Sequence, residues 1–191
     1  MDVEGGVDLY WIPLGAGHHS VRFNGMVFEA VAARLHHRTR DDLYHSALRV
    51  RVAEDLYSIE MTPIPIGRGE ERGVVAEGPV GSRTLGRLRV FRYEIRCWRN
   101  GDIPDLSFAV ASPVRVSEDA QTARRILQLL PSIPTPVWGR HELVADDMWN
   151  SNSVVSWVLT SAGLNSDDIP LPPHGRAPGW QAGSIVARRQ M

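Results

Sequence analysis

The most regular hydrophobic pattern in this chain is an alternation of apolar and polar residues over residues 43–52. A period of two is typical of a strand that has one face on the core and the other toward water. The apolar face comprises Tyr44, Leu48, Val50 and Val52. Residues 57–62 alternate in the same way, so a hairpin with its apolar faces together would place His45 on the face that carries Glu60.

Strand patterns recur elsewhere in the chain. Further strands are predicted at residues 8–14 and 88–98, and a short edge strand at residues 184–187. In the long pattern of residues 88–98, Cys97 falls on the same face as the apolar residues. We therefore expect this thiol to be a small buried group rather than an exposed nucleophile.

Helical periods predict three helices. One follows Ser117, a good N-cap, and ends before Pro131. Residues 21–35 also fit a helical period, although Asn24-Gly25 within them is a hairpin signal. The third helix begins near Asn150 and ends at Gly163.

Together these elements predict a single α+β domain over residues 1–191, with an antiparallel sheet packed against a few helices. Its length of 191 residues is enough to bury one substantial core. Residues 170–191, which begin with a proline-rich stretch, are expected to form a C-terminal extension of this domain.

The net charge and the type of basic residue exclude several classes of function. The formal net charge is −1, so bulk charge predicts neither nucleic acid nor an anionic membrane surface as a partner. All 21 basic side chains are arginine. A Walker phosphate loop, a pyridoxal Schiff base and a Ser-Lys dyad each need a lysine, so these classes are excluded. No Gly-x-Gly-x-x-Gly motif supports a dinucleotide site.

The cysteine content, the histidine positions and the length of the apolar runs indicate the cellular compartment and whether a metal site is expected. The single cysteine excludes an internal disulfide, and the apolar runs are too short to span a bilayer, so we expect a cytoplasmic protein without a membrane span. The pairs His18-His19 and His36-His37 are adjacent in sequence, and adjacent side chains diverge. No metal site and no cofactor are expected.

The strongest candidate for chemistry is the start of the third helix. Its residues 150–153 read Asn-Ser-Asn-Ser, a dense run of capping residues. Ser151 lies on the same stripe as the apolar residues of the helix, so its hydroxyl should point inward from the first turn. The helix dipole and unpaired N–H groups there favour negative charge, which suits an activated nucleophile or an oxyanion.

A histidine on the polar face of a neighbouring strand can act as the general base that takes the proton of such a serine. We therefore consider Ser151 as nucleophile, His45 as base and Glu60 as the group that orients the imidazole. The alternative is that the residues at the helix start only cap it and that His45 is an ordinary strand residue. Trp149, Asn150, Asn152 and Arg176 are the candidate substrate-binding residues.

Two loops contain arginine beside glycine and aromatic or histidine residues. These are residues 139–142 and 175–180. Either loop can border a pocket in which arginine pairs with a substrate carboxylate or phosphate, and ordinary surface roles are the alternative.

The motifs Tyr44-His45-Ser46-Ala47 and Asn150-Ser151-Asn152-Ser153, in this order, resemble the circularly permuted papain-like superfamily. That group includes permuted NlpC-type peptidases and relatives of lecithin:retinol acyltransferase, while the rest of the chain resembles an actinobacterial-type family. The resemblance implies hydrolysis or transfer of an acyl or amide group, with His45 as catalytic histidine, Glu60 as polar third member and Ser151 in the place of the usual cysteine. An alcohol is much harder to ionise than a thiol, whose free pKa is about 8.5.

With serine in the place of the usual cysteine, we consider three hypotheses for the function. The chain is an acyl or amide hydrolase or transferase acting on a small-molecule, lipid or peptide substrate, or an inactive module of the same fold that binds a lipid, peptide or protein partner. A structural role in a larger assembly is the third.

Overall fold

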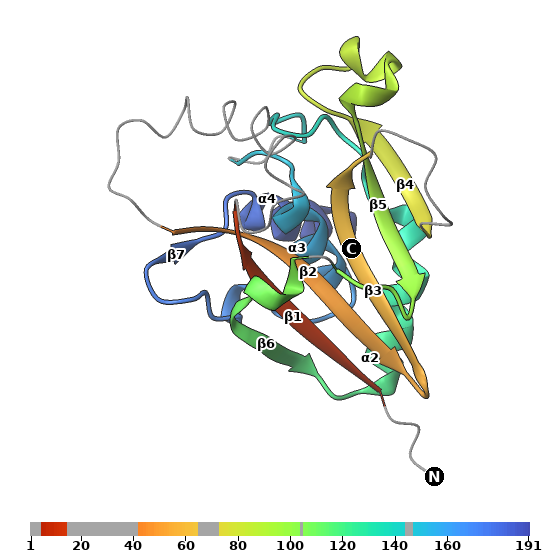
Figure 1. Ribbon diagram of the computed structural model, residues 1–191, viewed down its shortest axis with the longest axis vertical. Coiled ribbons are helices and arrows are strands. Elements are labelled where there is room, and N and C mark those ends of the chain that lie inside the picture. The colour runs from red at the N-terminus through yellow and green to blue at the C-terminus, as the bar shows by residue number, and fades with distance from the viewer. Residues whose placement is uncertain (1–4, 15–41, 65–72, 104, 144–146) are drawn as a thin grey trace.

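The computed structural model describes residues 5–14, 42–64, 73–103, 105–143 and 147–191, and it has an α+β fold (Figure 1). The strands are β1 (Gly5–Pro13), β2 (Asp42–Val52), β3 (Asp55–Pro63), β4 (Val74–Pro79), β5 (Arg92–Arg99), β6 (Val110–Ser117) and β7 (Gly175–Arg176). The helices of the described residues are α2 (Ala120–Leu129), α3 (Ser151–Ser161) and α4 (Trp180–Gln190). The predicted fold class, an antiparallel sheet packed against a few helices, is confirmed.

The sheet has the strand order β4-β5-β3-β2-β1-β6, and neighbours in this order are antiparallel. The short strand β7 pairs with the start of β2 in parallel. In the hairpin of β2 and β3, Leu48 lies opposite Ile59 and Arg49 lies opposite Ser58. The hairpin expected from the alternation is therefore present, with the apolar side chains of both strands on one face.

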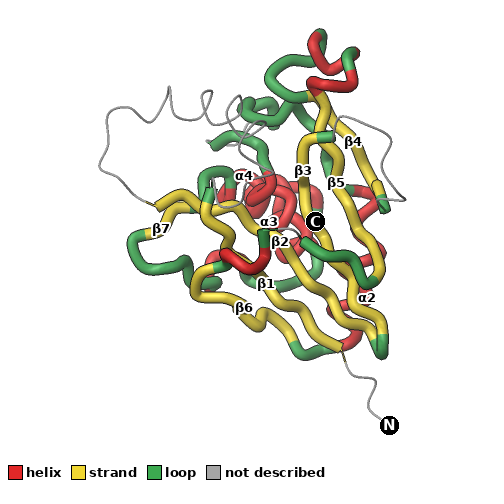
Figure 2. Tube along the Cα trace, in the orientation of Figure 1, coloured by secondary structure: helices red, strands yellow, loops and turns green. Residues whose placement is uncertain are grey.

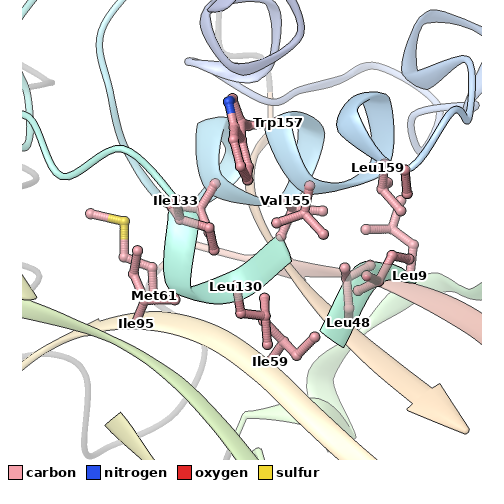
Figure 3. Close-up of a cluster of buried hydrophobic side chains, with 14 of the residues drawn as sticks. Leu9, Leu48, Ile59, Met61, Ile95, Leu130, Ile133, Val155, Trp157 and Leu159 are labelled. Carbon is pink, nitrogen blue, oxygen red and sulfur yellow. The ribbon is translucent and has the colours of Figure 1, made fainter. Parts of the chain in front are cut away.

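The main core lies between this apolar face and the helices. Figure 3 shows Leu48, Ile59 and Ile95 of the sheet beneath Val155 and Leu159 of α3. A smaller cluster forms on the opposite face of the sheet and consists of Ile12, Ala47 and Ile103. Because Ile12 is the cross-strand partner of His45, the imidazole lies on the face of this smaller cluster.

The helix α3 is buried along its whole length, since each of its eleven residues is classed as buried. The helix α4 packs directly on it. A Cβ atom at Gly183 would come within 2.0 Å of the carbonyl oxygen of Ser153, so only glycine permits this approach.

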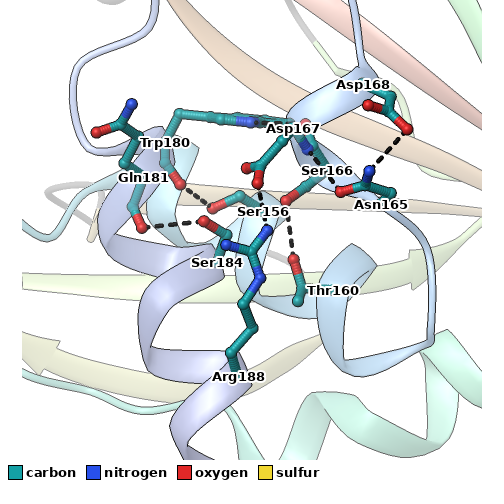
Figure 4. Close-up of polar contacts among 10 residues, drawn as sticks. All are labelled: Ser156, Thr160, Asn165, Ser166, Asp167, Asp168, Trp180, Gln181, Ser184 and Arg188. Atoms are coloured by element: carbon teal, nitrogen blue, oxygen red, sulfur yellow. Dashed lines mark hydrogen bonds and ion pairs between the residues drawn. The ribbon is translucent and has the colours of Figure 1, made fainter.

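Polar contacts reinforce this helix pair (Figure 4). Ser156 Oγ donates to the carbonyl oxygen of Trp180 at 2.6 Å, and the hydroxyls of Thr160 and Ser166 lie 2.8 Å apart. The indole N–H of Trp180 donates to the carbonyl oxygen of Ser166 at 3.0 Å. The end of the chain is thus bound tightly to the helix that carries the candidate site.

The structure corrects three details of the predicted elements. The segment expected as an edge strand at residues 184–187 belongs to α4, whose buried residues recur with a helical period. The strand expected from Leu88 begins only at Arg92, because two 3-10 turns, η1 (Leu85–Arg87) and η2 (Arg89–Phe91), precede it. Figure 2 shows these turns at the tip of an arm beyond β4 and β5.

The third correction concerns the N-cap of α2. Asp119 caps this helix, accepting hydrogen bonds from the backbone N–H groups of Gln121 and Thr122, while Ser117 Oγ accepts one from Asp119 N. The core position of Cys97 is confirmed, and burial raises the pKa of its thiol to about 11. The helix or hairpin predicted within residues 21–35 lies outside the described residues, and so do both adjacent histidine pairs.

Across the described segments, no helix combines the length and the hydropathy needed to span a bilayer.

Candidate functional site

The start of α3 has the capping geometry predicted for it. Asn150 is the N-cap, with φ −159° and ψ −165°. Its Oδ1 accepts hydrogen bonds from the backbone N–H groups of Asn152 at 2.9 Å and Ser153 at 3.3 Å. Ser153 Oγ in return accepts a hydrogen bond from Asn150 N at 3.0 Å. This reciprocal capping box places Ser151 at the first helical position.

Asn152 connects the helix start to the strand that carries His45. Its Nδ2 donates to the carbonyl oxygen of Tyr44 at 2.9 Å, and its Oδ1 accepts a hydrogen bond from Ser46 Oγ at 2.9 Å. Tyr44 and Ser46 are the two neighbours of His45 in the sequence. The tertiary structure therefore brings the two predicted motifs together at the level of the backbone.

This junction lies at an unpaired edge of β2. On the β3 side, the ladder between β2 and β3 covers Leu48–Val52, while β7 pairs with Asp42 and Leu43. Residues 44–47 lie between these two partners, and Asn152 binds the carbonyl oxygen of Tyr44 there. The helix start therefore takes the place of a neighbouring strand at this point. The side chain of His45 points to the face opposite the one on which Tyr44 and Leu48 pack against α3.

Ser151 is almost completely buried, with 6% of its surface exposed. In the described part of the chain, neither its hydroxyl nor its backbone N–H makes a hydrogen bond. The hydroxyl and the N–H are both available to a ligand.

His45 is half-buried, on the face of Ile12 and Ala47. Burial lowers the pKa of its imidazole to about 4, because the charged form loses solvation. The ring is therefore neutral near pH 7, and its protonated form is disfavoured. Among the described residues, no hydrogen bond joins this ring to Ser151.

Glu60 lies on the predicted face of β3, where its partner is an arginine of the neighbouring strand. Arg96 Nη1 lies 3.5 Å from Glu60 Oε1, and Arg96 Nε lies 2.5 Å from Glu94 Oε1. Burial raises the pKa of Glu60 to about 7, because Arg96 is shared with Glu94 and compensates the lost solvation only in part. Within the described ranges, no ion pair or hydrogen bond connects Glu60 to His45.

The C-terminal segment forms one wall of the helix start. The side-chain amides of Asn150 and Asn152 both donate to the carbonyl oxygen of Pro178, at 2.7 Å and 2.9 Å. Gly179 N donates to Asp147 Oδ2 at 2.5 Å. Gly179 has φ 85°, and a Cβ there would lie 2.5 Å from Asn150 Oδ1, so glycine is required.

These contacts were not foreseen in the sequence. The sequence indicated residues 175–180 as a loop that can border a pocket, but it did not indicate that Pro178 and Gly179 of this loop bind Asn150, Asn152 and Asp147 at the helix start. Only the Pro-Gly dipeptide gives a local signal, because it predicts a turn without indicating what the turn contacts.

The other candidate substrate-binding residues flank the same region. Trp149 is fully buried, and its indole N–H has no partner in the described part of the molecule. Arg176 is exposed in β7, opposite Leu43 of β2. Trp149 thus belongs to the core, whereas Arg176 lies at the surface near the start of the His45 strand.

A cavity of about 370 Å³ lies beside the loop that precedes α3. It is lined by Gly81, Ser82, Arg83, Val137, Arg140, His141 and Glu142. Of the loop at residues 139–142, Arg140, His141 and Glu142 therefore border a pocket. Within the described residues, no three histidine, cysteine, aspartate or glutamate side chains are grouped so that they could hold a metal ion.

The protein is thus an α+β protein in which Ser151 lies at the start of the buried helix α3, and this helix start is hydrogen-bonded to β2, the strand that carries His45. Comparisons of this chain with family models, with curated proteins and with solved structures found no match.

Proposed function

We propose that the chain is an acyl or amide hydrolase or transferase of papain-like type, with Ser151 as nucleophile and His45 as general base. The observation that carries this proposal is the pair of hydrogen bonds between Asn152 and the two neighbours of His45, to the Tyr44 carbonyl and from the Ser46 hydroxyl. Asn152 directly follows Ser151 in the sequence, so the backbones that bear both groups meet at one junction.

In the proposed reaction, the neutral imidazole of His45 accepts the proton of the Ser151 hydroxyl as Oγ bonds to the substrate carbonyl carbon. The oxyanion that forms is stabilised by the backbone N–H of Ser151 and by the helix dipole. Collapse of the intermediate breaks the bond to the leaving group, which takes the proton from His45. Water or a second nucleophile then attacks the acyl-serine ester and releases the product.

Glu60 has no step in this mechanism. Its carboxylate is bound by Arg96, so we propose a dyad of Ser151 and His45 in place of a triad.

A second candidate is a module of the same fold that binds a ligand without chemistry. It is favoured by the low pKa of His45 and by the lack of a hydrogen bond between this ring and Ser151 among the described residues. In an active enzyme such a bond can form when the substrate is bound.

Reaction with a fluorophosphonate probe, followed by mass spectrometry of the labelled peptide, distinguishes the two candidates. We expect the probe to modify Ser151, and modification to disappear in Ser151→Ala and in His45→Ala. Ser132→Ala, a substitution at an exposed serine, serves as the matched control and should leave labelling unchanged. Folded wild-type protein that stays unlabelled would exclude the hydrolase and leave the binding module.

A further inference from the structure

The cavity beside the loop before α3 is held between the sheet and the helix start. On one side, Trp138 N donates to the carbonyl oxygen of Pro79 at 2.9 Å, and Gly81 N donates to that of Trp138 at 3.1 Å. On the other side, Gly139 N donates to the carbonyl oxygen of Trp149 at 2.9 Å, and Trp149 N donates to that of Arg140 at 3.0 Å. Trp149 lies two residues before Ser151, so the loop that lines the cavity is hydrogen-bonded to the chain just before the proposed nucleophile.

The described residues around the cavity include two arginines and one carboxylate, so the positive charges exceed the negative charge by one. Arg83 and Glu142 form a two-bonded ion pair, with both N–O distances at 3.0 Å. Glu142 Oε2 also accepts a hydrogen bond from Val137 N, and the Arg83 guanidinium holds the pKa of this carboxyl below its usual range. The charges of Arg83 and Glu142 therefore cancel each other.

Arg140 is the remaining cation of the cavity. Its Nε donates to the carbonyl oxygen of Gly81 at 2.8 Å, which fixes the plane of the guanidinium. Its two terminal nitrogens make no hydrogen bond to the described residues. A guanidinium that is held at one nitrogen and open at the others is suited to bind an oxyanion through two parallel hydrogen bonds.

We infer that this cavity binds a carboxylate of the substrate, with Arg140 as its positioning residue. The inference rests on the proposed function, because it assigns the carboxylate to the substrate whose carbonyl group Ser151 would attack. One uncompensated positive charge matches a singly charged carboxylate better than a doubly charged phosphate. The substrate class is therefore an acyl or amide compound that carries a free carboxylate.

Calorimetric titration of the Ser151→Ala protein with N-acetyl-alanine tests this inference without turnover. We expect binding of this carboxylate and none of N-acetyl-alaninamide, which lacks the charge. Arg140→Gln should weaken binding about ten-fold, the loss of roughly one charge-assisted interaction. Arg89→Gln, which changes an exposed arginine outside the cavity, is the matched control and should bind as the parent does.

Three results would overturn the inference: equal binding of acid and amide, unchanged binding in Arg140→Gln, or tighter binding of inorganic phosphate. Failure of this test is separable from failure of the proposed function. If the protein is labelled at Ser151 but does not bind the carboxylate, the proposed enzyme activity is supported and the role of the cavity is refuted. If it binds the carboxylate through Arg140 but is not labelled, the proposed enzyme activity is refuted.

Discussion

The side chain of Asn152 donates a hydrogen bond of 2.9 Å to the backbone carbonyl of Tyr44, which is 108 positions away in the sequence. This contact fills a backbone acceptor at the unpaired edge of β2, where a neighbouring strand would otherwise bind. It also positions Ser151 and His45, which adjoin the two bonded residues. The structural stability of the helix start and the proposed chemistry therefore depend on the same side chain.

Replacement of Asn152 by alanine should destabilise the protein strongly. The substitution removes the hydrogen bonds of Asn152 with Tyr44, Ser46 and Pro178, although the Pro178 carbonyl keeps the bond from Asn150 Nδ2. We expect a loss of about 3 kcal/mol in the free energy of unfolding, measured by urea denaturation. Asn165→Ala, at an exposed cap, is the control and should cost less than about 1 kcal/mol. Equal effects of both changes would show that the junction at Tyr44 is not a source of stability.

His45 should make the protein less stable in weak acid. Its pKa is about 4 in the folded protein and 6.5 by reference, so the folded state binds fewer protons between these values. The contribution of His45 to the free energy of unfolding should therefore fall as the pH drops from 6.5 to 4, by up to about 3 kcal/mol. We expect His45→Gln to remove this part of the pH dependence, while His174→Asn, at an exposed histidine, keeps it. If His45→Gln lost as much stability as the wild type between pH 6.5 and 4, the burial of a neutral His45 ring would be contradicted.

Glu60 should have the opposite effect. Its pKa is about 7 in the folded protein and 4.5 by reference, so the folded state binds more protons in this range. The contribution of Glu60 to the free energy of unfolding should fall as the pH rises from 4.5 to 7, again by up to about 3 kcal/mol. In Glu60→Gln this loss should be absent, whereas Glu54→Gln, in an exposed turn, should follow the wild type. Unfolding free energies measured across this pH range provide the comparison, and an unchanged slope in Glu60→Gln would refute the assignment.

Local patterns in the sequence predicted the hairpin of β2 and β3 and the start of α3. The faces of the hairpin depend only on alternation, so the common side of His45 and Glu60 was already evident. The cap at Asn150 depends on hydrogen bonds within three residues, and these form wherever the chain turns into a helix.

Only the tertiary structure decided what these elements contact. The apolar pair Ile185-Val186 suits a strand as well as a helix, and the close approach of Gly183 to α3 selects the helix α4. In the same way, alternation places Glu60 on the correct face, but its carboxylate is bound by Arg96 of a strand that is distant in the sequence. Backbone conformation follows from neighbours along the chain, whereas partners depend on long-range packing, and this is why the sequence could indicate the motifs of the site but not the junction formed by Asn152.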